Sequence, residues 1–511
     1  MFKIKFFLSP KYVISLSILL SRITGLFREL FIAYLFGVGA NSDAVNTAFK
    51  LPNLFRRIFG EGALSSVFIP EYTKKRIESE IESKKFASSI FAILITTLLF
   101  LVLLMEIFMP YLMYLIAPGF SSDPAKLDLA ILLSRITIFY LVFISASALF
   151  GGMLNSIGKY APFAFAPVLL NLSIIMFTIC TKNVLDNKIA ISISILIAGI
   201  LQVGLVYLFV KLYRIDFKFS LPKMNEDSKV FIKRLSPAIV SGGMVQLSLF
   251  ISHSIASFFP GSISILSYAD RIYQLPLSVI GVTLSTMLLP ELSSLYQKNL
   301  TKQIFAKQNQ YIRIASLLSF PCAFGIYILS HPLIYILYQR GAFTDADTIM
   351  TARILALFAI GLPAFILNRI LMQVFYADGD TQTPMKITLY TLMINIVLNI
   401  LLILKLSYFG IALGTSIAAW VSVVIQIIYL RKSKLIEINR STYLYVIKSN
   451  FCSLIMFIIV SISLFYTKYM IYTNLGIFNQ ILGISINIIF GITSYFTMIF
   501  LFGMFKNIQD D

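Results

Sequence analysis

Residues 86–116 read FASSIFAILITTLLFLVLLMEIFMPYLMYLI and contain a single charged side chain, Glu106. A bilayer core about 30 Å thick is crossed by about 20 apolar residues in a helix. A helix on the surface of a water-soluble protein would instead show one polar face. Residues 86–116 therefore predict a membrane-spanning helix.

Comparable apolar runs recur along the whole chain of 511 residues, which is 58% hydrophobic and only 13% charged. This segmented hydrophobicity predicts an all-α polytopic membrane protein with about 14 transmembrane helices. The predicted spans are 12–37, 44–70, 86–116, 127–154, 160–181, 189–210, 230–258, 263–295, 311–338, 350–376, 384–405, 409–430, 442–466 and 478–505.

The formal net charge of +19 is distributed very unevenly between alternate loops. With the N-terminus placed in the cytoplasm, the inside loops carry about 26 Lys and Arg residues and the outside loops about 6. Because basic residues concentrate in cytoplasmic loops, both termini are expected to be cytoplasmic. The basic charge then reflects topology, and no nucleic-acid-binding motif accompanies it.

The two halves of the chain resemble each other at an offset of about 222 residues. PYLMYLIAPGF (110–120) corresponds to HPLIYILYQRGAF (331–343), and Pro162 corresponds to Pro384. A duplicated unit of six helices, an even number, implies two parallel repeats. The expected division is an N-terminal lobe over 1–215, a C-terminal lobe over 216–434, and two additional helices over 435–511.

Nothing in the sequence indicates a metal site or covalent chemistry. Cys180, Cys322 and Cys452 stand singly, His253 and His331 are far apart, and no acidic catalytic cluster is present. A packing role is favoured for His253 over a titrating one. The chain is therefore expected to be a transporter rather than an enzyme, and to need no cofactor.

Several basic residues fall inside predicted spans, where a charge costs about 2.5–3.5 kcal/mol on insertion scales. In the second span a polar stripe follows helical spacing, and Arg56 lies beside it. Pro52 is expected to kink this span. The stripe consists of Asn46, Lys50, Asn53, Arg57 and Glu61.

The first and eighth spans repeat this pattern. SRITGLFRE (21–29) contributes Arg22, Arg28 and Glu29, and the eighth span contributes Arg271 beside Asp270. The two polar faces are expected to meet across a central cavity. Because the buried charge is mostly arginine, the cavity should favour an anion such as phosphate. The alternative is a salt-bridge network that only holds the helices together.

Four segments resemble the MurJ (MviN) family of lipid II flippases. The longest is SRITGLFRELFIAYLFGVGANSDAVNTAFKLPNLFRRIFGEGALSSVFIPEY (21–72). The others are YADRIYQLPLSVIGVTLSTMLLPELS (268–293), NSIGKYAPFAFAPVLLN (155–171) and FYADGDTQTPMK (375–386). The resemblance implies the fold of the multidrug/oligosaccharidyl-lipid/polysaccharide exporter (MOP) superfamily: two six-helix lobes in a V, like the MATE transporters, with two further helices forming a groove for a lipid tail.

The resemblance also implies a substrate and its binding residues. The substrate would be lipid II, an undecaprenyl-pyrophosphate-linked disaccharide pentapeptide. Arg22, Arg28 and Arg271 match arginines that family members need in the cavity. Arg56 or Arg57, Asp43 and Glu61 match further functional positions, and Lys50 joins them on the polar stripe.

Some relatives have a sodium site that includes carboxylates, but no acidic residue lies deep in the spans that would form it here. Whether a coupling ion or the membrane potential drives transport therefore stays open. Expected partners are lipid II, membrane lipids and the cell-wall synthesis machinery, at the bacterial cytoplasmic membrane. The alternatives are a flippase for another polyprenyl-linked glycan, a MATE-type drug or cation antiporter, and a non-transporting scaffold.

Overall fold

The computed structural model describes residues 10–56, 63–472 and 476–504. These residues form helices joined by short turns, and no β-strand occurs among them, as predicted. The chain divides into two compact units, 1–264 and 265–511. The expected division into 1–215, 216–434 and 435–511 stays a prediction.

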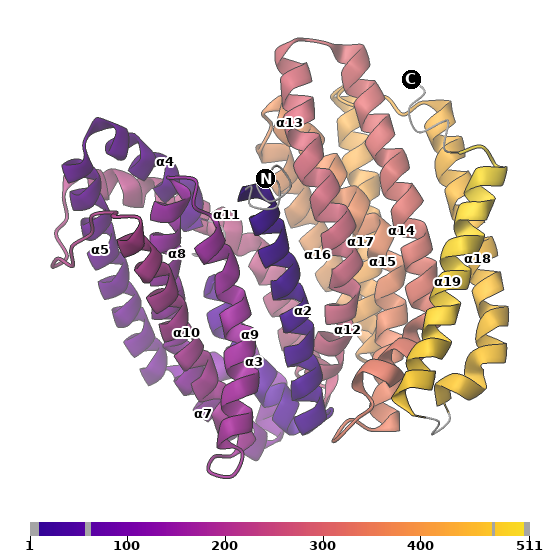
Figure 1. The fold of residues 1–511 in the computed structure, drawn as a ribbon, viewed down its shortest axis with the longest axis horizontal. Helices are drawn as coiled ribbons and strands as arrows, with labels where there is room; N and C mark the ends of the chain where they lie inside the picture. The colour runs from indigo at the N-terminus through magenta and orange to yellow at the C-terminus, as the bar shows by residue number, and fades with distance from the viewer. Residues whose placement is uncertain (1–9, 57–62, 473–475, 505–511) are drawn as a thin grey trace, which may run out of the picture. The chain divides into compact units, whose positions relative to one another are not determined.

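Unit 1 is built from long helices of apolar sequence interrupted by short helical pieces (Figure 1). Its elements are α2 (Pro10–Phe36), α3 (Ala40–Phe55), α4 (Ala63–Glu78), α5 (Glu80–Ile107), α6 (Met109–Ile116), η2 (Pro118–Ser122), α7 (Pro124–Ile138), α8 (Tyr140–Asn155), α9 (Ala161–Thr181), α10 (Asn187–Leu212) and α11 (Glu226–Ala256). Helix α2 packs along α9, and α11 packs on α4 and α6.

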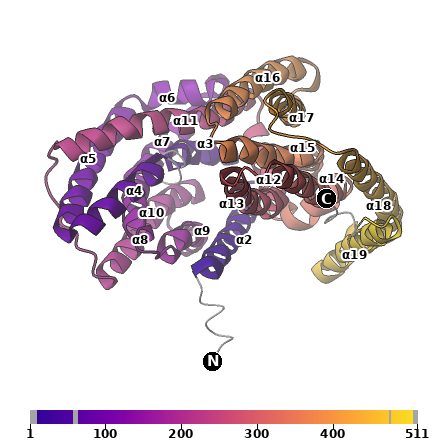
Figure 2. The same ribbon diagram turned by 90° about the horizontal axis from the view of Figure 1, so that it is seen from above.

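Unit 2 contains the longest helices of the chain. Its elements are α12 (Ser262–Pro276), whose first three residues belong to unit 1, η3 (Leu277–Val282), α13 (Thr283–Gln297), α14 (Thr301–Tyr338), α15 (Asp345–Asp378), α16 (Gln382–Leu406), α17 (Phe409–Lys432), α18 (Arg440–Tyr472) and α19 (Ile477–Leu501). Helices α14, α15 and α17 pack together, and α18 joins them through α14 (Figure 2).

Among the described residues, eleven helical segments are long and apolar enough to span a membrane. The predicted spans 12–37, 44–70 and 230–258 are not among the eleven, so the count of fourteen is not confirmed. Helix covers most of the described part of all three ranges. The first carries Arg22, Arg28 and Glu29, which lower its hydropathy.

Three predicted spans are not continuous α-helices. The range 86–116 breaks at Phe108, where Pro110 opens α6 at a position that tolerates a missing backbone N–H. The range 127–154 breaks at Phe139. The range 263–295 contains the π-helical turn η3 directly after Pro276, because proline has no backbone N–H to donate to the helical hydrogen bonds.

Hydrogen bonds to two pairs of residues reveal the internal repeat in three dimensions. In unit 1, Ser88 and Ser89 at the start of α5 bind the chain that leaves α10. In unit 2, Gln308 and Asn309, 220 residues later, bind the chain that leaves α17. The offset agrees with the sequence repeat, so the segments after α10 and after α17 are held in an equivalent way.

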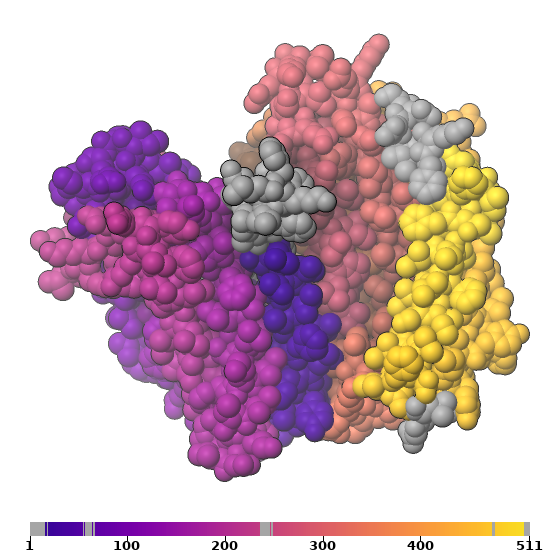
Figure 3. Space-filling view, viewed as in Figure 1, coloured from indigo at the N-terminus to yellow at the C-terminus, as the bar shows by residue number. Residues whose placement is uncertain are grey.

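Within unit 2, α18 and α19 pack against each other along a close seam. Gly483, Asn487, Gly491 and Tyr495 follow one another every four residues along α19, and all are buried. Glycines let two helices approach closely, and buried polar side chains supply hydrogen bonds across the interface. Tyr495 Oη donates to the Leu317 carbonyl of α14 at 2.6 Å. Figure 3 shows this hairpin in yellow.

Candidate functional site

Arg28 is held by side chains from three helices. Its side chain is almost fully buried, and Nη2 lies 2.5 Å from Glu29 Oε1. Nη1 donates to Asn171 Oδ1 at 3.1 Å, and the guanidinium lies 5.3 Å from the centre of the Phe49 ring. Three helices, α2, α3 and α9, therefore fix one guanidinium. A buried arginine held in this way presents its planar fork in one orientation.

Asn171 is a residue that sequence reasoning missed. Its Nδ2 donates to the Ser21 carbonyl at 3.2 Å and to Thr24 Oγ1 at 3.1 Å, while its Oδ1 accepts from Arg28. The amide thus ties α9 to two successive turns of α2. A polar residue in the apolar run 160–181 is the signal that could have identified it.

Arg22, Lys50 and Arg56 are partly buried, unlike Arg28. Arg22 lies six residues before Arg28 on the same helix, α2. Arg56 is the C-cap residue directly after α3, and its Nε donates to Asn53 Oδ1 at 2.9 Å. Arg57 and Glu61, the last two residues of the predicted stripe, lie outside the described residues.

Asp43 is fully buried, at the first turn of α3. Its carboxylate pairs with Lys126 Nζ at 2.7 Å and accepts from the backbone amides of Gly261 and Ser264 at 2.8 and 2.9 Å. Ser264 Oγ donates as well, at 2.6 Å. Because Ser264 lies in the first turn of α12, this carboxylate anchors the N-terminus of that helix. Lys126, predicted in an outside loop, is buried here.

The polar face predicted in span eight lies on α12 in unit 2. Arg271 is partly buried, and Gln274 Nε2 donates to the Asp270 carboxylate one turn away. Tyr273, between them in sequence, is buried and packs against Phe358. The basic and acidic groups of α12 thus belong to one helix that ends in the π-helical turn η3. Such turns occur frequently at functional sites.

His253 and two asparagines of α16 are hydrogen-bonded to neighbouring polar side chains. His253 Nε2 lies 3.1 Å from Thr47 Oγ1, which gives the buried ring a hydrogen-bond partner. In unit 2, Asn395 bonds to Thr415 and to Asn399. Within the described ranges no group of three His, Cys, Asp or Glu residues could hold a metal ion.

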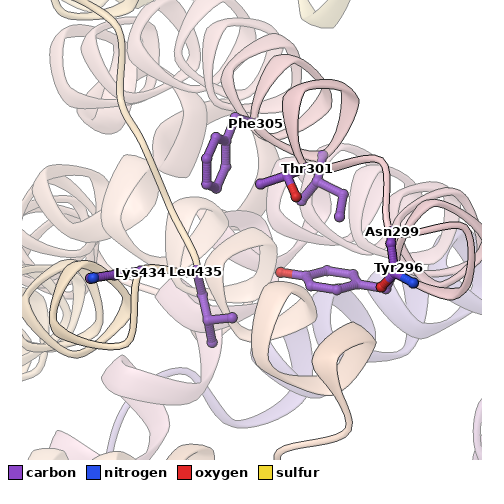
Figure 4. Close-up of a pocket in the computed structure, with 7 residues that line it drawn as sticks. Tyr296, Asn299, Thr301, Phe305, Lys434 and Leu435 are labelled. Carbon is purple, nitrogen blue, oxygen red and sulfur yellow. The ribbon is translucent and has the colours of Figure 1, made fainter.

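A cavity of about 190 Å³ lies in unit 2 between the turn after α13 and the segment after α17. In Figure 4, the Tyr296 hydroxyl points toward Leu435, whereas the Lys434 side chain extends away from the other lining residues. The cavity is too small for a glycan–peptide head group. None of the predicted site residues lines it.

Comparisons with known proteins agree with the expected resemblance. A sequence profile described as Lipid II flippase MurJ matches residues 32–483. A probable lipid II flippase MurJ of Rickettsia prowazekii is 48% identical over 478 residues, covering 93% of this chain and 94% of the relative. A probable lipid II flippase MurJ of Rhizobium tropici is 38% identical, covering 79% and 77%.

Solved structures support the same conclusion. A structure described as lipid II flippase MurJ in an inward closed conformation is 29% identical, with a TM-score of 0.81, and the match covers 96% of this chain and 98% of that one. An inward-facing MATE transporter of the MOP superfamily is 13% identical, with a TM-score of 0.70, and covers 81% and 95%. The second match shows the fold alone. The predicted polytopic helical fold is confirmed, and the chain belongs to the MurJ family of lipid II flippases.

Proposed function

We propose that this protein flips lipid II from the cytoplasmic to the outer leaflet by alternating access. The observation that carries the proposal is the 48% identity to a probable lipid II flippase over nearly the whole chain. The arginine-rich α2 supports it independently, because a pyrophosphate is an anion that arginine binds through paired hydrogen bonds. The cycle moves a molecule without making or breaking covalent bonds, so no cofactor is needed.

The pyrophosphate is bound by Arg22, Arg28, Arg271 and one of Arg56 and Arg57, with Lys50 adding positive charge. Arg28 supports this assignment by its geometry, since Asn171 and Glu29 hold the guanidinium fork in place. An arginine whose orientation is already fixed loses little entropy on binding. When substrate binds, a phosphate oxygen takes the place of the Glu29 carboxylate beside Nη2.

The two acidic residues act differently. Asp43 positions the N-terminus of α12 from a fully buried carboxylate, which is a supporting role rather than a contact with substrate. Glu61 is a further functional position, as the family resemblance implies. Asp43 thereby keeps α12, the helix that carries Arg271, in place while the anion enters and leaves.

The setting follows from the family and from the charge asymmetry. The protein resides in the bacterial cytoplasmic membrane with both termini in the cytoplasm, where its partners are membrane lipids and the cell-wall synthesis machinery. The two six-helix lobes are 1–215 and 216–434, and the helices of 435–511 provide the groove for the lipid tail. A coupling ion or the membrane potential supplies the driving force.

Substrate binding by the purified protein tests the proposal. Native mass spectrometry should detect lipid II on the wild type and on Arg353→Ala, a matched control at an exposed arginine of α15. Binding should fall at least about tenfold in Arg28→Ala and also in Asn171→Leu, since loss of a charge-assisted hydrogen bond costs about 1.5–3 kcal/mol. Equal binding by Arg28→Ala and Arg353→Ala would show that Arg28 does not hold the pyrophosphate.

A second set of ligands separates the substrate classes. Undecaprenyl pyrophosphate carrying an unrelated glycan should bind more weakly than lipid II. If it binds equally well or better, a flippase for another polyprenyl-linked glycan becomes the better assignment. If only cationic drugs bind, the antiporter assignment is correct.

A further inference from the structure

The linker between α10 and α11, residues 213–225, is fixed across the start of α5 (Figures 1 and 2). The Lys218 amide donates to Ser88 Oγ at 3.2 Å, and Ser220 Oγ donates to the Ser88 carbonyl at 3.2 Å. Ser89 Oγ donates to the Lys223 carbonyl at 2.9 Å. The linker is therefore a held element of unit 1 and not a loose connection.

Apolar side chains of the linker differ strongly in exposure. Ile215 is buried, and Phe217 packs edge-on against Phe150 with ring centres 5.1 Å apart. By contrast, Phe219 is 62% exposed and Leu221 is 79% exposed. Met224, further along, is 61% exposed. Ile215 and Phe217 secure the linker to unit 1. Part of the Phe219 ring lies beside Phe91 and Tyr207, with ring centres 5.6 and 6.0 Å apart, and its exposed part forms an apolar surface together with Leu221 and Met224.

The equivalent segment of unit 2 provides an internal comparison. Residues 433–439 leave α17 and are bound by Gln308 and Asn309, as the linker is bound by Ser88 and Ser89. There Ile436 is buried, and none of residues 433–439 is a large exposed apolar side chain. The repeated architecture therefore does not require exposed apolar residues at this place. The exposed apolar side chains of the unit 1 linker need a separate explanation.

The depth and the charge of the linker indicate what covers its exposed apolar side chains. The linker begins directly after α10, one of the candidate membrane spans, and it is bound at Ser88 and Ser89, where the predicted span 86–116 begins. It therefore runs at the level where apolar chains give way to lipid head groups. Residues 211–225 contain four basic side chains, all exposed, and one acidic one. Basic residues next to exposed apolar ones are typical of segments that bind anionic membrane surfaces.

We propose that residues 213–225 form an interfacial anchor, in which Phe219, Leu221 and Met224 insert among the head groups of anionic phospholipids while Lys218 and Lys223 contact the phosphates. The anchor fixes the depth of one end of unit 1 in the bilayer. It goes beyond the proposed function and does not depend on which lipid-linked molecule is transported.

A fluorescent label at position 221 tests the proposal. Cys180 and Cys322 are replaced by Ser, and an environment-sensitive dye is attached to Leu221→Cys or, as a control, to Glu226→Cys, whose native side chain is 85% exposed. The full-length protein is reconstituted in bilayers of phosphatidylglycerol. A nitroxide-bearing lipid should quench the label at 221 several-fold more than the label at 226, and aqueous iodide should show the reverse order.

A second set of measurements tests the contribution of the lysines. Each lysine near an anionic surface shifts membrane association about fivefold, so Lys218→Gln with Lys223→Gln should weaken lipid quenching at 221. Replacing phosphatidylglycerol by phosphatidylcholine should weaken lipid quenching at 221 in the same way. Iodide quenching at 221 as strong as at 226 would overturn the anchor. Protection of 221 from both quenchers would overturn it too, by showing a protein contact, and equal insertion in both lipids would overturn the anionic partner.

Discussion

The buried pair of Asp43 and Lys126 makes the sharpest prediction about stability. Asp43→Ala removes the acceptor of an ammonium, two backbone amides and a hydroxyl. Breaking a buried pair so that one charge stays uncompensated costs about 3–5 kcal/mol. Lys126→Met should cost less, about 1–3 kcal/mol, because the Asp43 carboxylate keeps its three hydrogen bonds to Gly261 and Ser264.

The assay is equilibrium unfolding of the purified protein in mixed micelles, with sodium dodecyl sulfate as denaturant and helical circular dichroism as the signal. Asp128→Ala is the control, since Asp128 is an exposed carboxylate on the same helix as Lys126 and should change stability by no more than about 0.5 kcal/mol. The reasoning is refuted if Lys126→Met destabilises as much as Asp43→Ala. It is also refuted if Asp43→Ala behaves like Asp128→Ala.

Three further predictions concern unit 2 and use the same unfolding assay. Arg313→Leu removes the buried donors to Ser441 and Thr442 at the start of α18 and should cost about 2–3 kcal/mol; a change below about 0.5 kcal/mol would contradict this role. Tyr495→Phe deletes the hydroxyl bonded to α14 and should cost about 0.5–1.5 kcal/mol, and a neutral result would show that packing alone holds the hairpin. Asp380, between α15 and α16, has its pKa lowered by hydrogen bonds from Thr383 and Gln382, so its contribution is present above the unfolded pKa of about 3.9 and lost as pH falls through the folded value. Asp380→Ala should therefore destabilise by about 1 kcal/mol at pH 7 and by progressively less as the pH falls below about 3.9, whereas an effect that does not change with pH would refute the assignment.

The fold class could be predicted from the sequence because bilayer thickness imposes a length and a composition on each span. Breaks within spans were harder to predict. Pro110 interrupts 86–116, yet Pro332, its counterpart in the repeat, lies inside the uninterrupted α14. Whether a proline breaks a helix depends on what packs around the freed carbonyl, and the local sequence does not contain that information.

The site was predicted in part. Arginine at helical spacing identified α2, α3 and α12. A charged side chain inside an apolar run costs free energy, so its presence indicates a functional role. Asn171 and Lys126 were not identified as partners. Each is paired with a residue more than 80 positions away in sequence. Such pairs depend on tertiary packing, so only the unusual presence of a polar residue could have marked them.

Restoration of flipping in cells is the most direct test of the central claim, that cavity arginines carry lipid II across the membrane. Bacteria depleted of their own lipid II flippase would express this protein, Arg28→Ala or Arg353→Ala at equal levels, and lipid II accessible on the outer leaflet would be measured. Exposure should return with the native protein and with Arg353→Ala but not with Arg28→Ala. Exposure restored equally by Arg28→Ala, or by none of the three despite correct insertion, would contradict the account.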